Sequence, residues 1–158
     1  MKSLPRVLFR PLHLLAVLAL LTAGAAAHAG EFFEKDGAAI RGYDPVAYFT
    51  DRKAVKGSRA YKAEYGKSVF HFATQANRDT FPADPARYAP QYNGFCAFGV
   101  AGGYKAAIDP AAFSVVDNKL YLNYNRDVQK KWSADIPGFV AKAEKNWPKV
   151  ATQTKVIE

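Results

Sequence analysis

The 158-residue sequence has one cysteine, Cys96, and one methionine, Met1. A single cysteine cannot form an internal disulfide, so the fold must rest on its hydrophobic core. The sequence also lacks C-x-x-C, H-E-x-x-H and G-x-G-x-x-G, the usual signatures of thiolate zinc sites, zinc proteases and dinucleotide-binding folds. No hydrolase motif surrounds Cys96, and a cysteine hydrolase needs a thiolate, a base and an orienting group together. We therefore expect a binding module rather than an enzyme.

Long apolar runs are absent beyond the N-terminus. Lys2, Arg6 and Arg10 give a positive start, an apolar run covers 14–27, and Ala-His-Ala at 27–29 is a typical cleavage site. This pattern predicts a signal peptide over residues 1–29, cleavage near Ala29, and a periplasmic or secreted bacterial protein. No later apolar run is long enough to cross a bilayer, so we expect no stable membrane insertion after cleavage.

After this segment, positively charged residues are only slightly in excess over negatively charged ones. The remaining 129 residues carry 19 Lys and Arg against 14 Asp and Glu, with no long basic run. An exported protein with diffuse charge is not expected to bind nucleic acid. A chain of this length suffices for one domain, and its many aromatic side chains can dominate the core.

The patterning predicts two β-hairpins, each followed by a helix. Alternating residues over 59–73 surround a turn at Tyr65-Gly66-Lys67, and a second hairpin over 113–123 turns at Asp117-Asn118. Helices are expected at 74–81, 125–133 and 137–147. The fold class is therefore α+β: a small single domain of short antiparallel β-hairpins packed with several short helices. The domain should cover 30–150, and residues 151–158 should fray.

Two local signals recur along the chain. Asp-Pro pairs at 44–45, 84–85 and 109–110 each predict a short helical turn, with Asp as the cap and Pro at the first position. Asn-Arg-Asp occurs at 77–79 and again at 125–127, 48 residues on, whereas Ala-Asp pairs at 83–84 and 134–135 lie 51 residues apart. The unequal spacings argue against an internal duplication.

Residues 72–88 carry a family pattern. They read F-A-T-Q-A-N-R-D-T-F-P-A-D-P-A-R-Y, which resembles the YHS domain, whose usual core reads Phe-Cys-Ser-x-x-Cys-x-x-x-Phe-x-x-x-Pro-x-x-Tyr. Phe72, Phe81, Pro85 and Tyr88 fall in register. G-Y-D-P-V-A-Y-F at 42–49, Y-A-P-Q-Y-N-G-F-C-A at 88–97 and L-Y-L-N-Y-N at 120–125 resemble the exported bacterial branch, and the likeness extends over residues 40–148.

The resemblance implies metal handling, because YHS domains with paired cysteines occur beside copper- and heavy-metal-transporting ATPases. Here Ala73 and Asn77 stand at the two cysteine positions. Neither residue supplies a thiolate, so that metal site cannot be transferred to this chain. Cys96 is then the remaining candidate for thiol chemistry, with glycines on both sides and Gly102-Gly103 as a potential flap.

Several ligands and roles remain open for Cys96. The leading hypothesis is that Cys96 is a soft-metal ligand, with copper as the metal and His71 as a weak second ligand. Two ligands are too few for a closed site, so a further side chain, water or a second subunit of a homodimer would complete it. A small ligand could instead bind a polar pocket formed by Tyr43, Asp44, Tyr92 and Asn93. Alternatives are a thiol redox protein and a structural or interaction domain with a buried Cys96.

Overall fold

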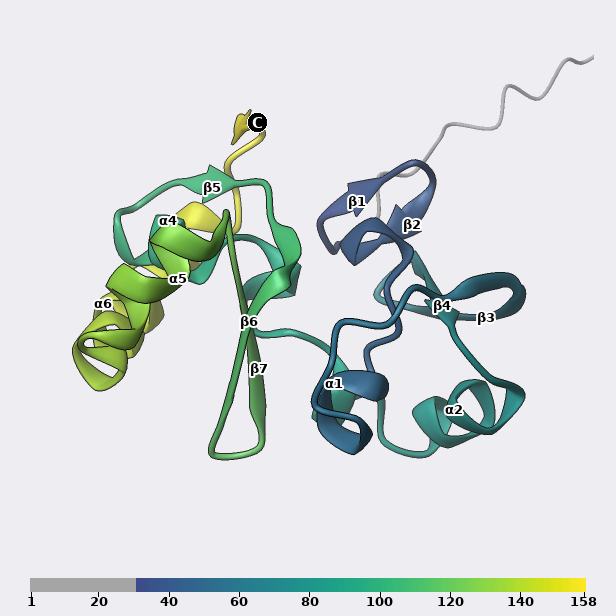
Figure 1. The fold of residues 1–158 in the computed structure, drawn as a ribbon. Helices are drawn as coiled ribbons and strands as arrows, with labels where there is room; N and C mark the ends of the chain where they lie inside the picture. Colours follow the sequence, from purple (N-terminus) through teal and green to yellow (C-terminus); the bar gives the residue numbers. More distant parts are fainter. Residues whose placement is uncertain (1–30) are drawn as a thin grey trace, which may run out of the picture.

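The computed structural model describes residues 31–158. The predicted signal peptide lies outside the described residues. None of the helices within 31–158 is both long and apolar enough to span a membrane. The described chain forms short helices and short antiparallel strand pairs around one core (Figure 1), so the predicted α+β class is confirmed.

The strands of residues 31–158 form four two-stranded sheets, and three of the pairs are antiparallel. The fourth pairs β5 with β8 in parallel. The strands are β1 (Glu34–Lys35), β2 (Ala38–Ala39), β3 (Ser58–Tyr65), β4 (Ser68–Phe72), β5 (Lys105–Ala106), β6 (Asp109–Val116), β7 (Lys119–Asn123) and β8 (Val156–Ile157).

Helical segments connect these strands and cover them. The α-helices are α1 (Ala47–Thr50), α2 (Gln75–Thr80), α3 (Pro85–Tyr88), α4 (Ala97–Ala101), α5 (Arg126–Ser133) and α6 (Ile136–Val150). Three 3₁₀ turns are η1 (Ile40–Gly42), η2 (Phe81–Ala83) and η3 (Gln91–Gly94). In Figure 1, β3, β4 and α2 lie on one side of the molecule, and α4, α5 and α6 lie on the other.

The two predicted hairpins are confirmed and have the same construction. The β3–β4 pair and the β6–β7 pair each join an eight-residue strand to a five-residue strand. Both have a register shift near the start of the longer strand. Both turns place two residues at positive φ: Gly66 and Lys67 in the first, Asp117 and Asn118 in the second.

A constant offset of 51 residues relates the two hairpins and the helices that follow them. It separates Ser58 from Asp109 at the strand starts, and Thr74 from Asn125, the side-chain caps of α2 and α5. It also separates Asp84 from Asp135, which cap α3 and α6. We call residues 58–88 the first repeat and residues 109–139 the second repeat.

The Asn-Arg-Asp triplets are not equivalent in these repeats. Asn77 lies inside α2, whereas Asn125 precedes α5 and caps it through the backbone N–H of Val128. The unequal spacing that argued against duplication therefore came from comparing residues at different structural positions. Capping required a polar side chain at both helix starts, and Thr74 meets this need in one repeat and Asn125 in the other.

Two further expectations need correction. The Asp109-Pro110 pair does not open a helical turn but starts β6, where Asp109 accepts a hydrogen bond from the backbone N–H of Ala111. Asp-Pro is compatible with a strand start because Pro needs no ladder partner there. The C-terminal residues do not fray throughout, since Val156 and Ile157 pair with β5.

The core is aromatic and runs through both repeats. Phe70, Phe72 and Phe81 pack together in the first repeat, with ring centroids 5.1–5.2 Å apart for the pairs that include Phe81. In the second repeat, Trp132 contacts Tyr121 and Phe139. Phe70, Phe72, Phe81, Tyr121 and Trp132 belong to one hydrophobic cluster, and Phe139 packs against it. Cys96 is also part of this cluster, and in the sequence it lies between the two repeats.

Candidate functional site

Cys96 is buried at the start of a short helix. It caps α4, and its Sγ accepts a hydrogen bond from the backbone N–H of Gly99 at 3.4 Å. The residue is 1% exposed, and its thiol donates toward Oδ1 of Asn123 at 3.9 Å. Burial raises the pKa of the Cys96 thiol, although the backbone N–H groups of Gly99, Tyr124 and Phe98 act in the opposite direction. Cys96 is therefore a protonated thiol at neutral pH.

A cavity of about 350 Å³, which we call the Cys96 cavity, has this residue in its wall. The lining comes from α4 and the residue before it, the segment around β5, α5 and the segment before it, and the C-terminal strand β8. The lining residues are Cys96, Phe98, Tyr104, Ala106, Tyr124, Val128, Lys131 and Ile157. Apolar and aromatic side chains predominate, and Lys131 is the one charged residue among them. Such a lining suits a small, mainly apolar ligand.

The glycines near Cys96 allow an aromatic ring to pack closely. A Cβ at Gly99 would lie 3.1 Å from Cε2 of Tyr104, and a Cβ at Gly102 would lie 2.8 Å from its Cε1. The ring of Tyr104, itself part of the cavity lining, therefore rests directly on these two glycines. This gives the glycines a packing role beyond the conformational freedom expected from the sequence.

Asn123 supports the loop from behind. It is fully buried at the end of β7, and its Oδ1 accepts a hydrogen bond from the backbone N–H of Phe98 at 3.4 Å. Its Nδ2 has no hydrogen-bond partner among residues 31–158. A buried amide donor without a partner is unfavourable by about 1–3 kcal/mol. Asn123 is thus the polar residue of the Cys96 region that the sequence reasoning did not identify.

Asp44 has a different role from the one expected for a pocket residue. Its carboxylate is fully buried and accepts four hydrogen bonds. Oδ1 accepts from the backbone N–H groups of Val46 at 2.8 Å and Ala47 at 3.2 Å. Oδ2 accepts from the backbone N–H of Ala73 at 2.8 Å and from Nδ2 of Asn77 at 2.7 Å. The two positions that carry cysteines in the usual YHS pattern therefore hold the Asp44 carboxylate.

Asp44 and Cys96 occupy comparable places in the chain. Each accepts from the backbone N–H three residues later, at the start of α1 or α4. Asp44 also accepts from Ala73, the residue after β4, and the equivalent Tyr124 after β7 acts on the Cys96 thiol through its backbone N–H. The segment before the first repeat thus supplies a fully hydrogen-bonded carboxylate, and the segment before the second repeat supplies a thiol beside a cavity.

His71 lies elsewhere, on the outer face of β4. Side chains alternate along β4, so Phe70 and Phe72 are buried in the core and His71 lies half-buried on the opposite face. Partial burial lowers the pKa of His71, and the nearby cations Arg59, Lys56 and Lys62 lower it further. His71 lines a separate cavity that does not include Cys96.

The remaining pocket candidates are divided between two places. Tyr43 is half-buried and forms a β-bridge with Lys56, whose ammonium lies 5.0 Å from its ring centroid. Tyr92 and Asn93 line another cavity of about 260 Å³, where the Tyr92 hydroxyl donates to Glu144 at 3.3 Å. Burial raises the pKa of Tyr92, and the charge of Glu144 adds to this effect. Thus the structure brings Tyr92 and Asn93 together, but neither lines the Cys96 cavity.

The donor set around Cys96 does not fit a closed metal site. Among residues 31–158, no group of three or more His, Cys, Asp or Glu side chains is placed to hold a metal ion. Of the described residues that line this cavity, Cys96 is the only His, Cys, Asp or Glu. A soft metal there would need ligands from outside the cavity lining.

These features define a small α+β domain with a ligand-sized cavity beside its cysteine. Residues 46–92 match the family model of the YHS domain, so the resemblance is confirmed over this segment. The match contains Ala73, Asn77 and His71, and it ends before Cys96. No curated protein and no solved structure matches the chain.

Proposed function

We propose that the protein is an exported YHS-type module that binds a small ligand in the Cys96 cavity. The cavity of about 350 Å³ carries the proposal, because its wall contains the chain's single thiol and is otherwise mainly apolar. The unpartnered Asn123 amide behind this wall is a further polar group in the region. Export rests on the charge pattern, apolar run and cleavage motif of residues 1–29.

A soft metal such as copper is the more specific form of this proposal. It is supported by the thiol of Cys96 and by the metal handling that the YHS resemblance implies. The lining favours a small organic ligand over a bare ion, since it offers one soft donor and mostly carbon surface. Copper bound here would be cargo that retains an external ligand.

The experiment compares two probes in the purified protein. Phenol serves as a small, mainly apolar ligand and is followed by amide shifts in an NMR titration. Cu(I) is offered under reducing conditions in competition with a coloured chelator. We expect phenol to shift amides of α4 and α5 saturably. Val128→Trp, which fills the cavity, should abolish these shifts.

Val140→Trp is the matched control, because Val140 is also half-buried but lines a different cavity. Equal phenol binding in the two tryptophan variants would contradict the proposal. Cys96→Ser separates the ligand classes, since a serine hydroxyl keeps a polar cap but is a poor ligand for Cu(I). Loss of Cu(I) binding in this variant alone would favour the metal.

A structural role for the thiol is the second candidate, favoured by its 1% exposure and its hydrogen bond to the start of α4. In that case Cys96→Ala lowers stability without changing the binding of either probe. The redox alternative has the least support, because a buried thiol with a raised pKa forms little reactive thiolate at neutral pH.

A further inference from the structure

A second cavity shares no lining residue with the Cys96 cavity, and its wall contains His71 and several positively charged side chains. It has a volume of about 160 Å³ and lies between the β1–β2 hairpin, η1, the start of β3 and the outer face of β4. Its charged lining consists of Lys35, Asp36, Arg41, Lys56 and Arg59. We call it the basic cavity, since four cations and one carboxylate surround it.

Two glycines allow the wall of the basic cavity to pack closely against His71. A Cβ at Gly57 would lie 2.5 Å from the backbone carbon of His71, which leaves no room for a side chain. Gly42 has φ +71°, and a Cβ there would lie 3.1 Å from Nδ1 of His71. The backbone N–H of Gly57 donates to the carbonyl of Gly42 at 2.9 Å, which fixes these two segments against each other. This part of the cavity wall is therefore closely packed.

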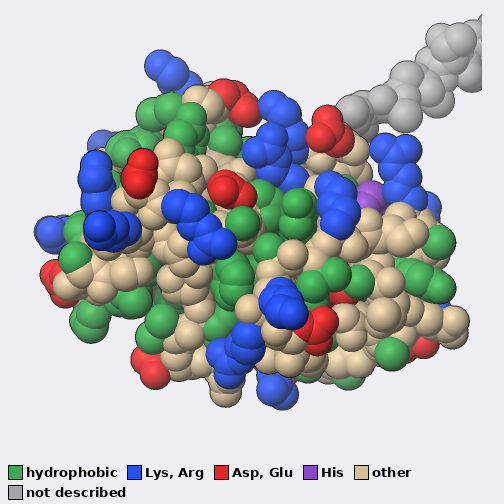
Figure 2. All heavy atoms as spheres, viewed as in Figure 1, with side chains coloured by type: hydrophobic (Ala, Val, Ile, Leu, Met, Phe, Trp, Pro, Cys, Tyr) green, Lys and Arg blue, Asp and Glu red, His purple; other side chains and the backbone are tan. Residues whose placement is uncertain are grey.

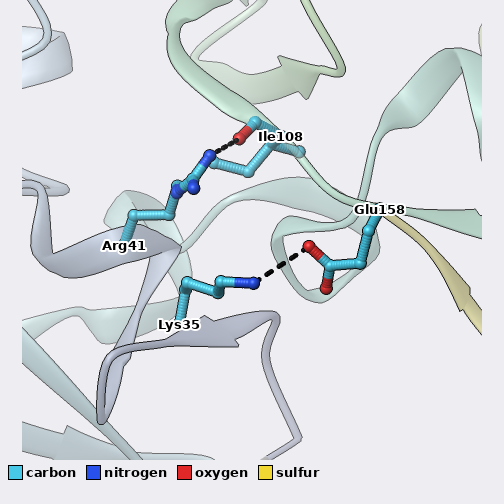
Figure 3. Close-up of polar contacts among 4 residues, drawn as sticks. All are labelled: Lys35, Arg41, Ile108 and Glu158. Atoms are coloured by element: carbon cyan, nitrogen blue, oxygen red, sulfur yellow. Dashed lines mark hydrogen bonds and ion pairs between the residues drawn. The ribbon is translucent and has the colours of Figure 1, made fainter.

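Most of the positive charge is not neutralised by carboxylates. Lys35 pairs with Glu158 at 3.1 Å, and Arg41 donates instead to the carbonyl of Ile108 at 3.2 Å (Figure 3). Lys56 donates to the carbonyl of Arg41. Within residues 31–158, the side chain of Arg59 makes no hydrogen bond or ion pair. Backbone carbonyls orient two of the cations but leave their charge available.

The space-filling view shows the histidine side chain at the surface among Lys and Arg side chains (Figure 2). The charged groups that face it are Asp36 from the β1–β2 hairpin, Lys35 and Arg41 beside it, and Lys56, Arg59 and Lys62 from the β3 segment. Like charges held this close repel one another unless an anion lies between them. Burial and this repulsion lower the pKa of the His71 imidazole, and an anion bound among the cations would raise it again.

We propose that the basic cavity binds a small oxyanion of the sulfate or phosphate class, with Arg59, Lys56 and His71 as its principal contacts. The volume is about five times the ~30 Å³ that one water occupies in the liquid, so it accommodates such an anion together with water. This site is separate from the Cys96 cavity and does not depend on the proposed function.

The test follows the His71 imidazole by NMR in the purified full chain, with its signal identified by its loss in His71→Asn. Sulfate is the main probe because its charge is constant across the pH range, and chloride at matched ionic strength is the reference. We expect sulfate to raise the pKa of His71 by about 1 unit, since an opposite charge stabilises the imidazolium. By linkage, sulfate should bind up to about tenfold more tightly below this pKa than above it.

Two variants of β3 separate the basic cavity from general charge. Arg59→Gln removes a lining cation, whereas Lys62→Gln removes a cation that acts on His71 but does not line the cavity. Both side chains are exposed, so both variants should fold, which circular dichroism checks. Sulfate should bind at least about tenfold more weakly to Arg59→Gln, and its affinity for Lys62→Gln should change less than about twofold.

Three outcomes would overturn the proposal. One is an equal shift of the His71 pKa in sulfate and in chloride. Another is equal sulfate binding by Arg59→Gln and the unchanged protein. The third arises with phosphatidylglycerol vesicles: a response to vesicles but not to sulfate or inorganic phosphate would assign the site to a lipid headgroup instead of a free oxyanion.

Discussion

At the scale of single residues, the Asp44 carboxylate contacts the two positions at which the usual YHS pattern has cysteines. Ala73 contributes a backbone N–H and Asn77 a side-chain amide, and both donate to Oδ2 of Asp44. The other carboxylate oxygen caps the turn that leads into α1. A thiol pair could hold a soft metal here, whereas this hydrogen-bonded group fixes α1 against β4 and α2. The substitution therefore exchanges ligand chemistry for a structural connection.

Asp44→Ala should destabilise the protein strongly. The change leaves three backbone N–H groups and the Asn77 amide without their acceptor, and each unpaired buried donor costs about 1–3 kcal/mol when water cannot reach it. We expect a loss of at least about 3 kcal/mol in the free energy of unfolding, measured by urea denaturation.

Asp84→Ala is the control for this prediction. Asp84 is also a helix cap preceding a proline, but it is exposed and accepts from the backbone N–H of Arg87. Its loss should cost about 1 kcal/mol, as for an ordinary cap. Equal effects of the two alanine variants would show that the hydrogen bonds from Ala73 and Asn77 contribute nothing to stability.

The sequence predicted local contacts at this scale but not the distant ones. The Asp44-Pro45 pattern indicated a cap, because the cap and the N–H groups it accepts from lie within three residues. Nothing local indicated that Asn77 would reach Asp44, or that Asn123 would meet Cys96. These contacts join residues 33 and 27 positions apart and depend on the whole fold.

At the scale of elements, the alternation of side chains was sufficient to predict the two hairpins, and polar capping residues were sufficient to predict the starts of α2 and α5. The Asp-Pro signal was ambiguous, since it starts α3 at residue 84 but β6 at residue 109. What decides between them is the pairing with β7, which a local pattern does not contain. The 51-residue repeat could not be predicted from the sequence for a related reason. The two identical Asn-Arg-Asp triplets do not lie at equivalent structural positions.

The C-terminal strand β8 closes one side of the Cys96 cavity. Ile157 lines the cavity, and its carbonyl accepts from the backbone N–H of Ala107 at 2.8 Å. Lys105 of β5 donates to the carbonyls of Ala151 and Gln153, and these hydrogen bonds hold the segment before β8 close to β5. A two-residue strand is a small element, so it should open more easily than the core.

Removal of residues 155–158 should therefore expose Cys96 more often. We expect iodoacetamide to alkylate the thiol at least about tenfold faster in this variant, with a loss of only about 1 kcal/mol in global stability. Mass spectrometry measures the rate. Lys35→Gln is the control, because it breaks only the exposed ion pair with Glu158 and should leave the rate nearly unchanged. An unchanged rate in the truncated chain would mean that β8 does not protect Cys96.

At the scale of the whole molecule, η1 and α1, which precede the first repeat, contact the start of the second repeat and the residue before it. The Tyr48 hydroxyl donates to the carbonyl of Pro110 at 3.0 Å, and its ring meets Phe113 edge-on at 4.8 Å between centroids. Arg41 adds its hydrogen bond to the carbonyl of Ile108. Because the hydrophobic cluster is also continuous, the two repeats should not behave as independent folding units.

Tyr48→Phe tests this coupling. The variant keeps the ring but leaves the buried carbonyl of Pro110 without this donor, so the free energy of unfolding should fall by about 1–2 kcal/mol. Urea unfolding is followed by the fluorescence of Trp132 and Trp147, which report on α5 and α6, and by NMR signals of Phe70 and Phe72 in the first repeat. Both sets of signals should show one common urea midpoint, and Tyr48→Phe should shift that midpoint equally in both sets.

Tyr61→Phe is the control, since it changes a half-buried ring of β3. This variant should change the midpoint little. Separate midpoints for the two sets would instead mean that each repeat unfolds alone, and Tyr48 would then stabilise an interface between two units rather than one cooperative core.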